Sequence, residues 1–279
     1  MDRFVDCFFT EHQVQKSLPG DSSWNLSGDG NHVYHQLLYS MAGNQCVLEF
    51  ESALPDGRAF LVLLGSEKMN YDDLIYIVPA ALLAITGHEF AHGYVSWKMG
   101  DPTPKEDGRL SLNPFHHLDI MGTLCLILFR FGWAKPVRIN SWYYKDRKKG
   151  VFCTALAGPA ANFIMAFVGL FGMGLIYKFT AGYAGNVLVY LFNLLNYFAV
   201  LNIGLGVFNL IPVPPLDGSK VYGILAHDDE NYMEKHVNRY GYIVLAILAV
   251  TGILSIPMRL AQNAVINFMY GIVRLILRF

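Results

Sequence analysis

Charged residues are scarce in this chain. Only 15% of its 279 residues are charged, whereas 53% are hydrophobic. In a soluble globular domain about a quarter of the residues carry a charge, so the composition argues against a soluble protein. The formal net charge is −1, and no basic stripe with interleaved aromatic residues occurs. We therefore expect no nucleic-acid partner.

Cysteine is also rare. The four cysteines are Cys7, Cys46, Cys125 and Cys153, and no two of them form a C-x-x-C pair. This argues against a disulfide scaffold and against a cysteine zinc site. Residues 1–20 contain acidic residues and lack the long apolar run of a signal peptide, so we expect membrane insertion to rely on internal hydrophobic segments.

Long charge-free runs dominate the rest of the sequence. Residues 150–177 and 179–216 contain no charged side chain. Since about 20 apolar residues cross the hydrocarbon of a bilayer, such runs predict membrane helices. The fold class that we predict is therefore an all-α polytopic membrane protein. Three helices form its core and two more follow at the C-terminus: 72–99, 151–177, 186–210, 240–256 and 260–277, the last two hinged at Pro257.

Three regions are predicted along the chain: an N-terminal extension (1–68), a membrane core (69–226) and C-terminal membrane helices (227–279). The extension contains an alternating run, a turn and a short apolar run, which favour a small soluble hairpin. A poorly ordered tail is the alternative, and a natural start at Met69 is a third. The apolar run 120–129 is too short to span comfortably, so a re-entrant or interfacial segment is expected.

The loop 135–149 predicts the orientation of the membrane helices. It contains six Lys or Arg residues and a single acidic residue, Asp146. By the positive-inside rule, this loop is cytoplasmic. Arg274 and Arg278 favour a cytoplasmic C-terminus in the same way.

The first apolar helix carries the motif His88-Glu89-Phe90-Ala91-His92. Residues four apart lie on one face of a helix, so the two imidazoles can bind one Zn²⁺ with the Glu89 carboxylate beside them. In such a site the glutamate acts as general base. Two histidines and a glutamate are costly in an apolar segment unless they have a task. The plain alternative is a pair of core histidines bonded to nearby backbone.

A catalytic zinc needs a third protein ligand and one open position. Asp217 is the best candidate, because it follows a long uncharged run and lies in a proline-rich break that can line a polar cavity. From spacing alone, a role as N-cap of the following helix is about as well supported. His116, His117 and Asp119 are the other candidates.

The sequence resembles the site-2 protease family of intramembrane zinc metalloproteases, in its compact bacterial branch. The resemblance covers residues 74–225 approximately and rests on four motifs in the family's order. They are His88-Glu89-Phe90-Ala91-His92, then Leu112-Asn113-Pro114-Phe115-His116-His117-Leu118-Asp119 with Gly132-Trp133-Ala134-Lys135-Pro136-Val137, then Ala157-Gly158-Pro159-Ala160-Ala161-Asn162, and Asn209-Leu210-Ile211-Pro212-Val213-Pro214-Pro215-Leu216-Asp217-Gly218.

The resemblance implies that His88, His92 and Asp217 bind zinc, that Glu89 is the base and that Asn209 faces the substrate or the oxyanion. His117 and Asn162 are candidates for contacts behind the metal ligands, although His117 can instead fix its loop. The implied activity is an endopeptidase of a bacterial plasma membrane, acting on a single-span membrane protein in the bilayer during regulated intramembrane proteolysis.

Two other functions fit parts of the sequence. A zinc transporter also places His and Asp in membrane helices, but it gains nothing from Glu89 beside the first histidine. Transporters also often contain paired repeats, and no convincing repeat is found here. A catalytically silent membrane scaffold is the third possibility. The sequence leaves the substrate and the oligomeric state open.

Overall fold

The structure is a computed structural model that describes residues 73–119, 135–180, 185–227 and 251–278, with a few positions between 232 and 248. Within the predicted helix 240–256, the described positions 240, 241, 243–245, 247 and 248 are helical. The predicted hairpin within 1–68 and the segment 120–129 lie outside the described residues. The predictions for them stay untested.

Helices make up the framework of the described residues. Four of them are long and apolar enough to cross a membrane: α5 (Leu74–Met99), α8 (Arg147–Thr180), α9 (Asn186–Asn209) and α12 (Ser255–Leu277). Shorter helices are α6 (Thr103–Glu106) and α10 (Asp217–His227). The prediction of an all-α multi-pass membrane fold is confirmed.

Local sequence explains where α5 and α8 end and begin. Gly100 follows α5 with φ 115°, a left-handed conformation that suits glycine and lets its N–H bond the carbonyls of Ser96 and Trp97. The start of α8 was predicted at residue 151 but lies at Arg147. The reason is Asp146, whose carboxylate accepts a hydrogen bond (3.1 Å) from the N–H of Lys149 and so caps the helix.

The last helix also differs from the prediction. α12 begins at Ser255 rather than at 260, and Pro257 lies in its first turn, where a missing N–H costs no helical hydrogen bond. The chain turns instead at Gly252, which has φ 68°. The predicted hinge at Pro257 is therefore wrong by a few residues.

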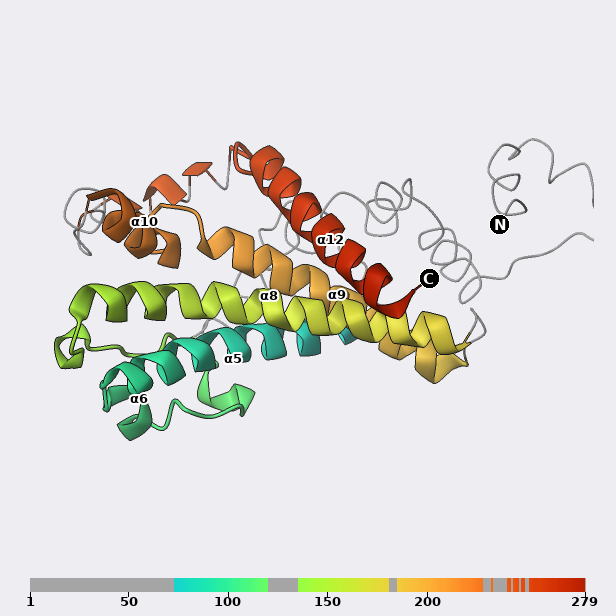
Figure 1. Ribbon diagram of the computed structural model, residues 1–279, viewed down its shortest axis with the longest axis horizontal. Helices are drawn as coiled ribbons and strands as arrows, with labels where there is room; N and C mark the ends of the chain where they lie inside the picture. The colour runs from blue at the N-terminus through green and yellow to red at the C-terminus, as the bar shows by residue number, and fades with distance from the viewer. Residues whose placement is uncertain are drawn as a thin grey trace, which may run out of the picture.

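Helix α8 lies at the centre of the bundle and packs against α5, α9, α10 and α12. In Figure 1, α5 and α8 run side by side and α12 crosses the bundle obliquely. The apolar core includes Ala166 and Leu170 of α8, Ile203 of α9 and Val273 of α12. Lys178 donates a hydrogen bond of 2.7 Å to the carbonyl of Leu277, which ties the end of α8 to the end of α12.

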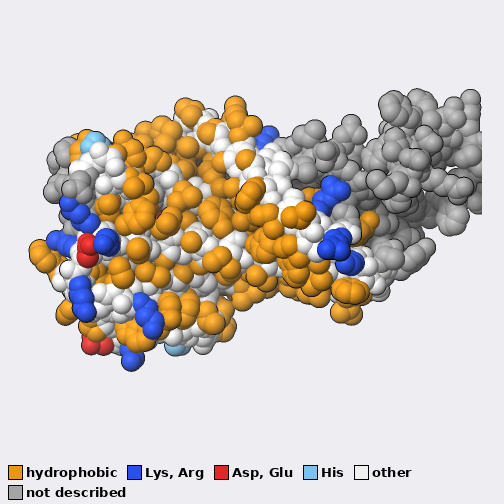
Figure 2. Space-filling view, viewed as in Figure 1, with side chains coloured by type: hydrophobic (Ala, Val, Ile, Leu, Met, Phe, Trp, Pro, Cys, Tyr) orange, Lys and Arg blue, Asp and Glu red, His pale blue; other side chains and the backbone are white. Residues whose placement is uncertain are grey.

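The outer surface is apolar over the middle of the bundle. Figure 2 shows hydrophobic side chains over most of the visible face and Lys and Arg toward its two ends. Exposed apolar residues include Ile164 and Val168 of α8 and Leu260 and Phe268 of α12. Such a continuous surface is costly in water but suits lipid chains, as expected of an integral membrane protein.

Candidate metal centre

The two histidines of the motif face each other across one turn of α5. His88 and His92 are 8% and 6% exposed, and their Nε2 atoms lie 3.0 Å apart. Their other ring nitrogens contact α8: His88 Nδ1 lies 3.1 Å from Asn162 Oδ1, and His92 Nδ1 lies 2.7 Å from the carbonyl of Thr154. If the two residues were only core histidines bonded to nearby backbone, this would explain the contacts of their Nδ1 atoms. It would not explain why their Nε2 atoms lie so close together.

The protonation of these rings follows from their partners. A carbonyl oxygen and an amide oxygen only accept hydrogen bonds, so both Nδ1 atoms carry the proton and donate. In the neutral rings, both Nε2 atoms then present lone pairs toward the same point. Two lone pairs 3.0 Å apart repel each other unless a metal ion, or a proton shared with a nearby acceptor, lies between them. The arrangement therefore favours a bound metal ion.

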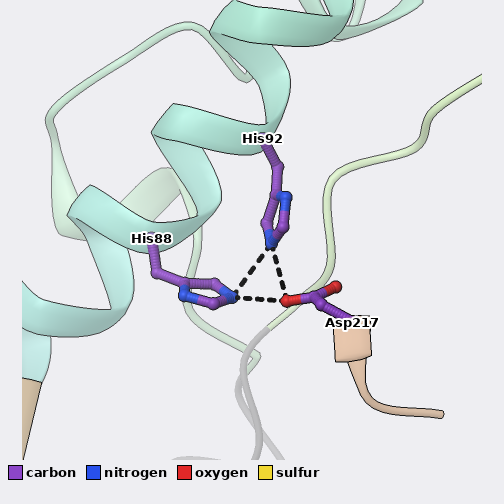
Figure 3. A group of neighbouring side chains, drawn as sticks. All are labelled: His88, His92 and Asp217. Atoms are coloured by element: carbon purple, nitrogen blue, oxygen red, sulfur yellow. Dashed lines mark hydrogen bonds and ion pairs between the residues drawn. The ribbon is translucent and has the colours of Figure 1, made fainter. Parts of the chain in front are cut away.

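Asp217 completes the group. It is the first residue of α10 and follows the proline-rich break after α9. Its Oδ2 lies 3.1 Å from Nε2 of His92 and 3.3 Å from Nε2 of His88, as Figure 3 shows. Among the described residues, these three form the one group of His, Cys, Asp and Glu whose ligand atoms converge closely enough for a metal. His116, His117 and Asp119 do not belong to it.

The three ligand atoms, Nε2 of His88, Nε2 of His92 and Oδ2 of Asp217, form a triangle of the size that a zinc ion needs. Ligand atoms about 2.0–2.1 Å from a tetrahedral Zn²⁺ lie about 3.3–3.4 Å from one another. The three distances here are 3.0, 3.1 and 3.3 Å. Two imidazoles and a carboxylate are typical donors of a catalytic zinc, which keeps its fourth position open. The residues present therefore fit the ion, and the cofactor of this protein is Zn²⁺.

Gly158 makes room for the metal ligands. A Cβ atom placed on this residue of α8 would lie 2.3 Å from Nε2 of His92 and 2.7 Å from Nε2 of His88. No side chain fits at those distances, so the glycine lets α8 approach the histidine pair directly. This close contact gives the Ala157-Gly158-Pro159 motif a physical reason.

Glu89 lies beside the triangle and has its own anchor. Its Oε2 accepts a hydrogen bond of 3.0 Å from the backbone N–H of Val137. Val137 is buried and belongs to the irregular segment 135–140, which precedes α8. The sequence indicates neither this contact nor the Thr154 carbonyl behind His92, because a backbone carbonyl is common to all residues and a backbone N–H to all except proline.

The remaining predicted residues lie in different surroundings. Asn162 is fully buried and contacts His88, and its role behind the metal ligands stays a prediction. Asn209 donates a hydrogen bond of 3.0 Å to the carbonyl of Leu205 within α9, and its role toward substrate stays a prediction. His117 is fully buried, and its Nε2 lies 2.8 Å from the carbonyl of Ser111, which suits the loop-fixing role.

A helical membrane protein that joins an H-E-x-x-H helix to a distant aspartate has the architecture of a membrane zinc metalloprotease. A family model described as Peptidase family M50 matches residues 173–251, the part that contains Asn209 and Asp217. The chain belongs to this family, the site-2 proteases, and it is a zinc metalloprotease.

Relatives in bacteria and archaea are also named as zinc metalloproteases. The zinc metalloprotease YwhC of Bacillus subtilis is 36% identical over 176 residues, which span 63% of this chain and 80% of the relative. Rip2 of Mycolicibacterium smegmatis is 27% identical over 198 residues, or 65% and 69% of the two chains. MJ0611 of Methanocaldococcus jannaschii is 28% identical over 158 residues, or 54% and 72%. No solved structure matches the chain significantly.

Proposed function

We propose that this protein is an intramembrane endopeptidase that hydrolyses peptide bonds within or beside the transmembrane segments of other membrane proteins. The observation that carries the proposal is the position of the metal ligands and Glu89. His88, Glu89 and His92 belong to α5, a helix apolar enough to span the bilayer. A peptidase centre built there acts on substrates that reach it from the membrane.

The depth of the site supports this reading. His92 contacts Thr154, which lies seven residues after Arg147, the first residue of α8. At a rise of about 1.5 Å per residue, the histidine lies about 10 Å along α8 from Arg147 and about 7 Å from Lys149, the last residue of the basic loop. With that loop on the cytoplasmic side, the centre is inside the membrane and near its cytoplasmic face.

The side chains divide the chemistry between them. His88, His92 and Asp217 would hold a zinc ion, and its chemistry there would be to activate a water and to polarise the carbonyl of the peptide bond. Glu89 takes the proton from the attacking water and returns it to the leaving amine. Because the N–H of Val137 holds Oε2, the rotation of the carboxylate is restricted and its other oxygen stays available to accept the proton. Asn209, near the end of α9, serves as a hydrogen-bond donor to the substrate carbonyl.

The substrate that we propose is a single-span membrane protein, such as an anti-sigma factor or a signal-peptide remnant, cut in the plasma membrane of a bacterium. Support comes from the bacterial relatives among the named zinc metalloproteases. Cleavage of such a protein close to the cytoplasmic face would release a cytoplasmic part, which is the outcome of regulated intramembrane proteolysis.

Glu89 also distinguishes this function from the two alternatives. A zinc transporter or a silent scaffold can use the three ligands but has no need of a carboxylate held by a dedicated backbone N–H. In a peptidase, the same carboxylate is indispensable. Replacing Glu89 therefore separates proteolysis from zinc binding.

The test is membrane proteomics of cells that express the wild type, Glu89→Gln or Glu106→Gln. Glu106 is an exposed residue of α6 and provides the matched control. We expect uncut single-span proteins to accumulate with Glu89→Gln, while the purified variant retains zinc, and we expect Glu106→Gln to match the wild type. Membrane protein fragments that persist unchanged with Glu89→Gln would refute the proposal.

A further inference from the structure

A chain of hydroxyl groups is buried next to the metal centre and links it to the loops at the end of α5. Thr154 Oγ1 lies 3.1 Å from the hydroxyl of Tyr144, which lies 2.8 Å from Oγ of Ser96. Ser96 donates a hydrogen bond of 2.8 Å to Oδ2 of Asp101. Exposure of these residues is between 0% and 6%, so water does not compete for the bonds.

The direction of the hydrogen bonds follows from the carboxylate at the end. Ionised Asp101 only accepts, so the single proton of Ser96 is committed to it. Tyr144 must then donate to Ser96, and Thr154 must donate to Tyr144, because each hydroxyl has one proton. Asp101 is itself held by the N–H groups of Asn140 (2.8 Å) and Thr103 (3.0 Å). Every hydroxyl in the chain thus has one fixed orientation.

The chain of hydroxyl groups forms a closed network of contacts with His92. Ser96 lies one turn after His92 on α5, and the carbonyl of Thr154 receives the Nδ1–H of His92 at 2.7 Å. The residue that fixes the ring of His92 is therefore itself fixed by Tyr144. Gly150 accommodates this arrangement, because a Cβ there would lie 2.2 Å from Cδ2 of the Tyr144 ring.

We infer that Tyr144, Ser96 and Asp101 are positioning residues of the metal centre, which hold Thr154 so that its carbonyl keeps the His92 ring directed at zinc. The inference deepens the proposed function and rests on its metal centre, not on the identity of the substrate. Groups that orient metal-bound histidines typically affect metal affinity 10–100-fold. Tyr144 acts through Thr154, so we expect an effect of about tenfold, at the lower end of that range.

The experiment compares Tyr144→Phe with Tyr143→Phe in purified full-length protein in detergent. Both variants lose one phenolic hydroxyl, but Tyr143 is 54% exposed and does not belong to the hydroxyl network. Zinc affinity is measured by competition with a chelator, and the ligand field of the site by the absorption spectrum of the Co²⁺-loaded protein. Ser96→Ala removes the middle of the chain with a smaller change and serves as the second variant. Thermal unfolding verifies that each variant is folded.

We expect Tyr144→Phe and Ser96→Ala to bind zinc about tenfold more weakly and to show an altered Co²⁺ spectrum, whereas Tyr143→Phe matches the wild type. A purely structural role would lower thermal stability but leave the Co²⁺ spectrum unchanged, and that result would overturn the inference. So would wild-type affinity in both Tyr144→Phe and Ser96→Ala. Since no cleavage is measured, either result leaves the proposed peptidase activity intact, and the Glu89→Gln experiment tests that activity separately.

Discussion

The carboxylate of Glu89 accepts a hydrogen bond from the backbone N–H of Val137, 48 residues further along the chain. The residue that we propose as general base is thus oriented by the irregular segment 135–140, which lies outside its own helix. That segment is fastened at two other points, by Arg138 to Asp107 and by the N–H of Asn140 to Asp101. The position of the base therefore depends on the loops around the site.

Val137→Pro tests this dependence by removing the one N–H that holds Glu89. We expect peptide cleavage in membranes to fall at least about tenfold, because the base loses its fixed orientation, while zinc affinity stays at the wild-type level. Ile139→Pro places the same ring in the same segment and controls for damage to the loop. Equal cleavage by the two variants would contradict the role of the Val137 N–H.

Asn162→Leu removes the acceptor for His88 Nδ1 and leaves a buried ring N–H without a partner. We expect zinc affinity to fall about 10–100-fold, as measured by chelator competition. Asn202→Leu is the matched control, since Asn202 is also fully buried but bonds the carbonyl of Phe198 in its own helix. If both variants bound zinc equally well, Asn162 would have no special part in the metal centre.

Gly158→Ala introduces a methyl group where only 2.3 Å separates the new Cβ from Nε2 of His92. The variant is expected to lose zinc binding, although alanine favours the helix by up to about 1 kcal/mol over glycine. Gly271→Ala in α12 adds the same group where nothing lies within 4 Å, and it should bind zinc normally. The measurement is the zinc content of the two purified variants. A Gly158→Ala variant that contains zinc would show that α8 does not approach the histidines this closely.

The carboxyl group of Asp101 should make the stability of the fold depend on pH. Burial raises the pKa of its carboxyl, but hydrogen bonds from Asn140, Thr103 and Ser96 outweigh this effect and hold the pKa below its ordinary value. The unfolded chain then binds the proton more readily, so this group stabilises the fold at neutral pH, and the stabilisation is lost as the pH falls from the ordinary pKa through the lowered one. In thermal unfolding, the advantage of the wild type over Asp101→Asn should shrink on acidification from pH 7 to pH 3. If the difference in thermal stability between the wild type and Asp101→Asn did not change with pH, this role of Asp101 would be contradicted.

Much of the framework could be predicted because the membrane imposes long apolar helices. The charge-free runs located α8 and α9, and Gly100 marked the end of α5. The start of α8 at Arg147 is less evident from the sequence, because its N-cap residue Asp146 lies within a basic stretch that is typical of a loop. The displacement of the last turn from Pro257 to Gly252 follows from the tolerance of the first helical turn for proline.

The site could be predicted in part. The helical spacing of His88 and His92 is a local property, so the pair follows from the sequence. Asp217 is 125 residues from His92, and spacing alone could not distinguish it from an N-cap; the family resemblance singled it out. The contacts of Thr154 and Val137 could not be found, because their backbone groups carry no sequence signal and only the packing of α8 and of the loop on α5 brings them to the site.

We propose that His88, His92 and Asp217 together hold the zinc of this protein. The most direct measurement is the zinc content and zinc affinity of the purified wild type, Asp217→Ala and Asp119→Ala, the last replacing a carboxylate that lies outside the ligand group. We expect one zinc per chain in the wild type and in Asp119→Ala, and an affinity in Asp217→Ala that is weaker by more than the about 10–100-fold typical of losing an outer partner of a ligand. Wild-type zinc binding by Asp217→Ala, or its loss in Asp119→Ala alone, would contradict the account.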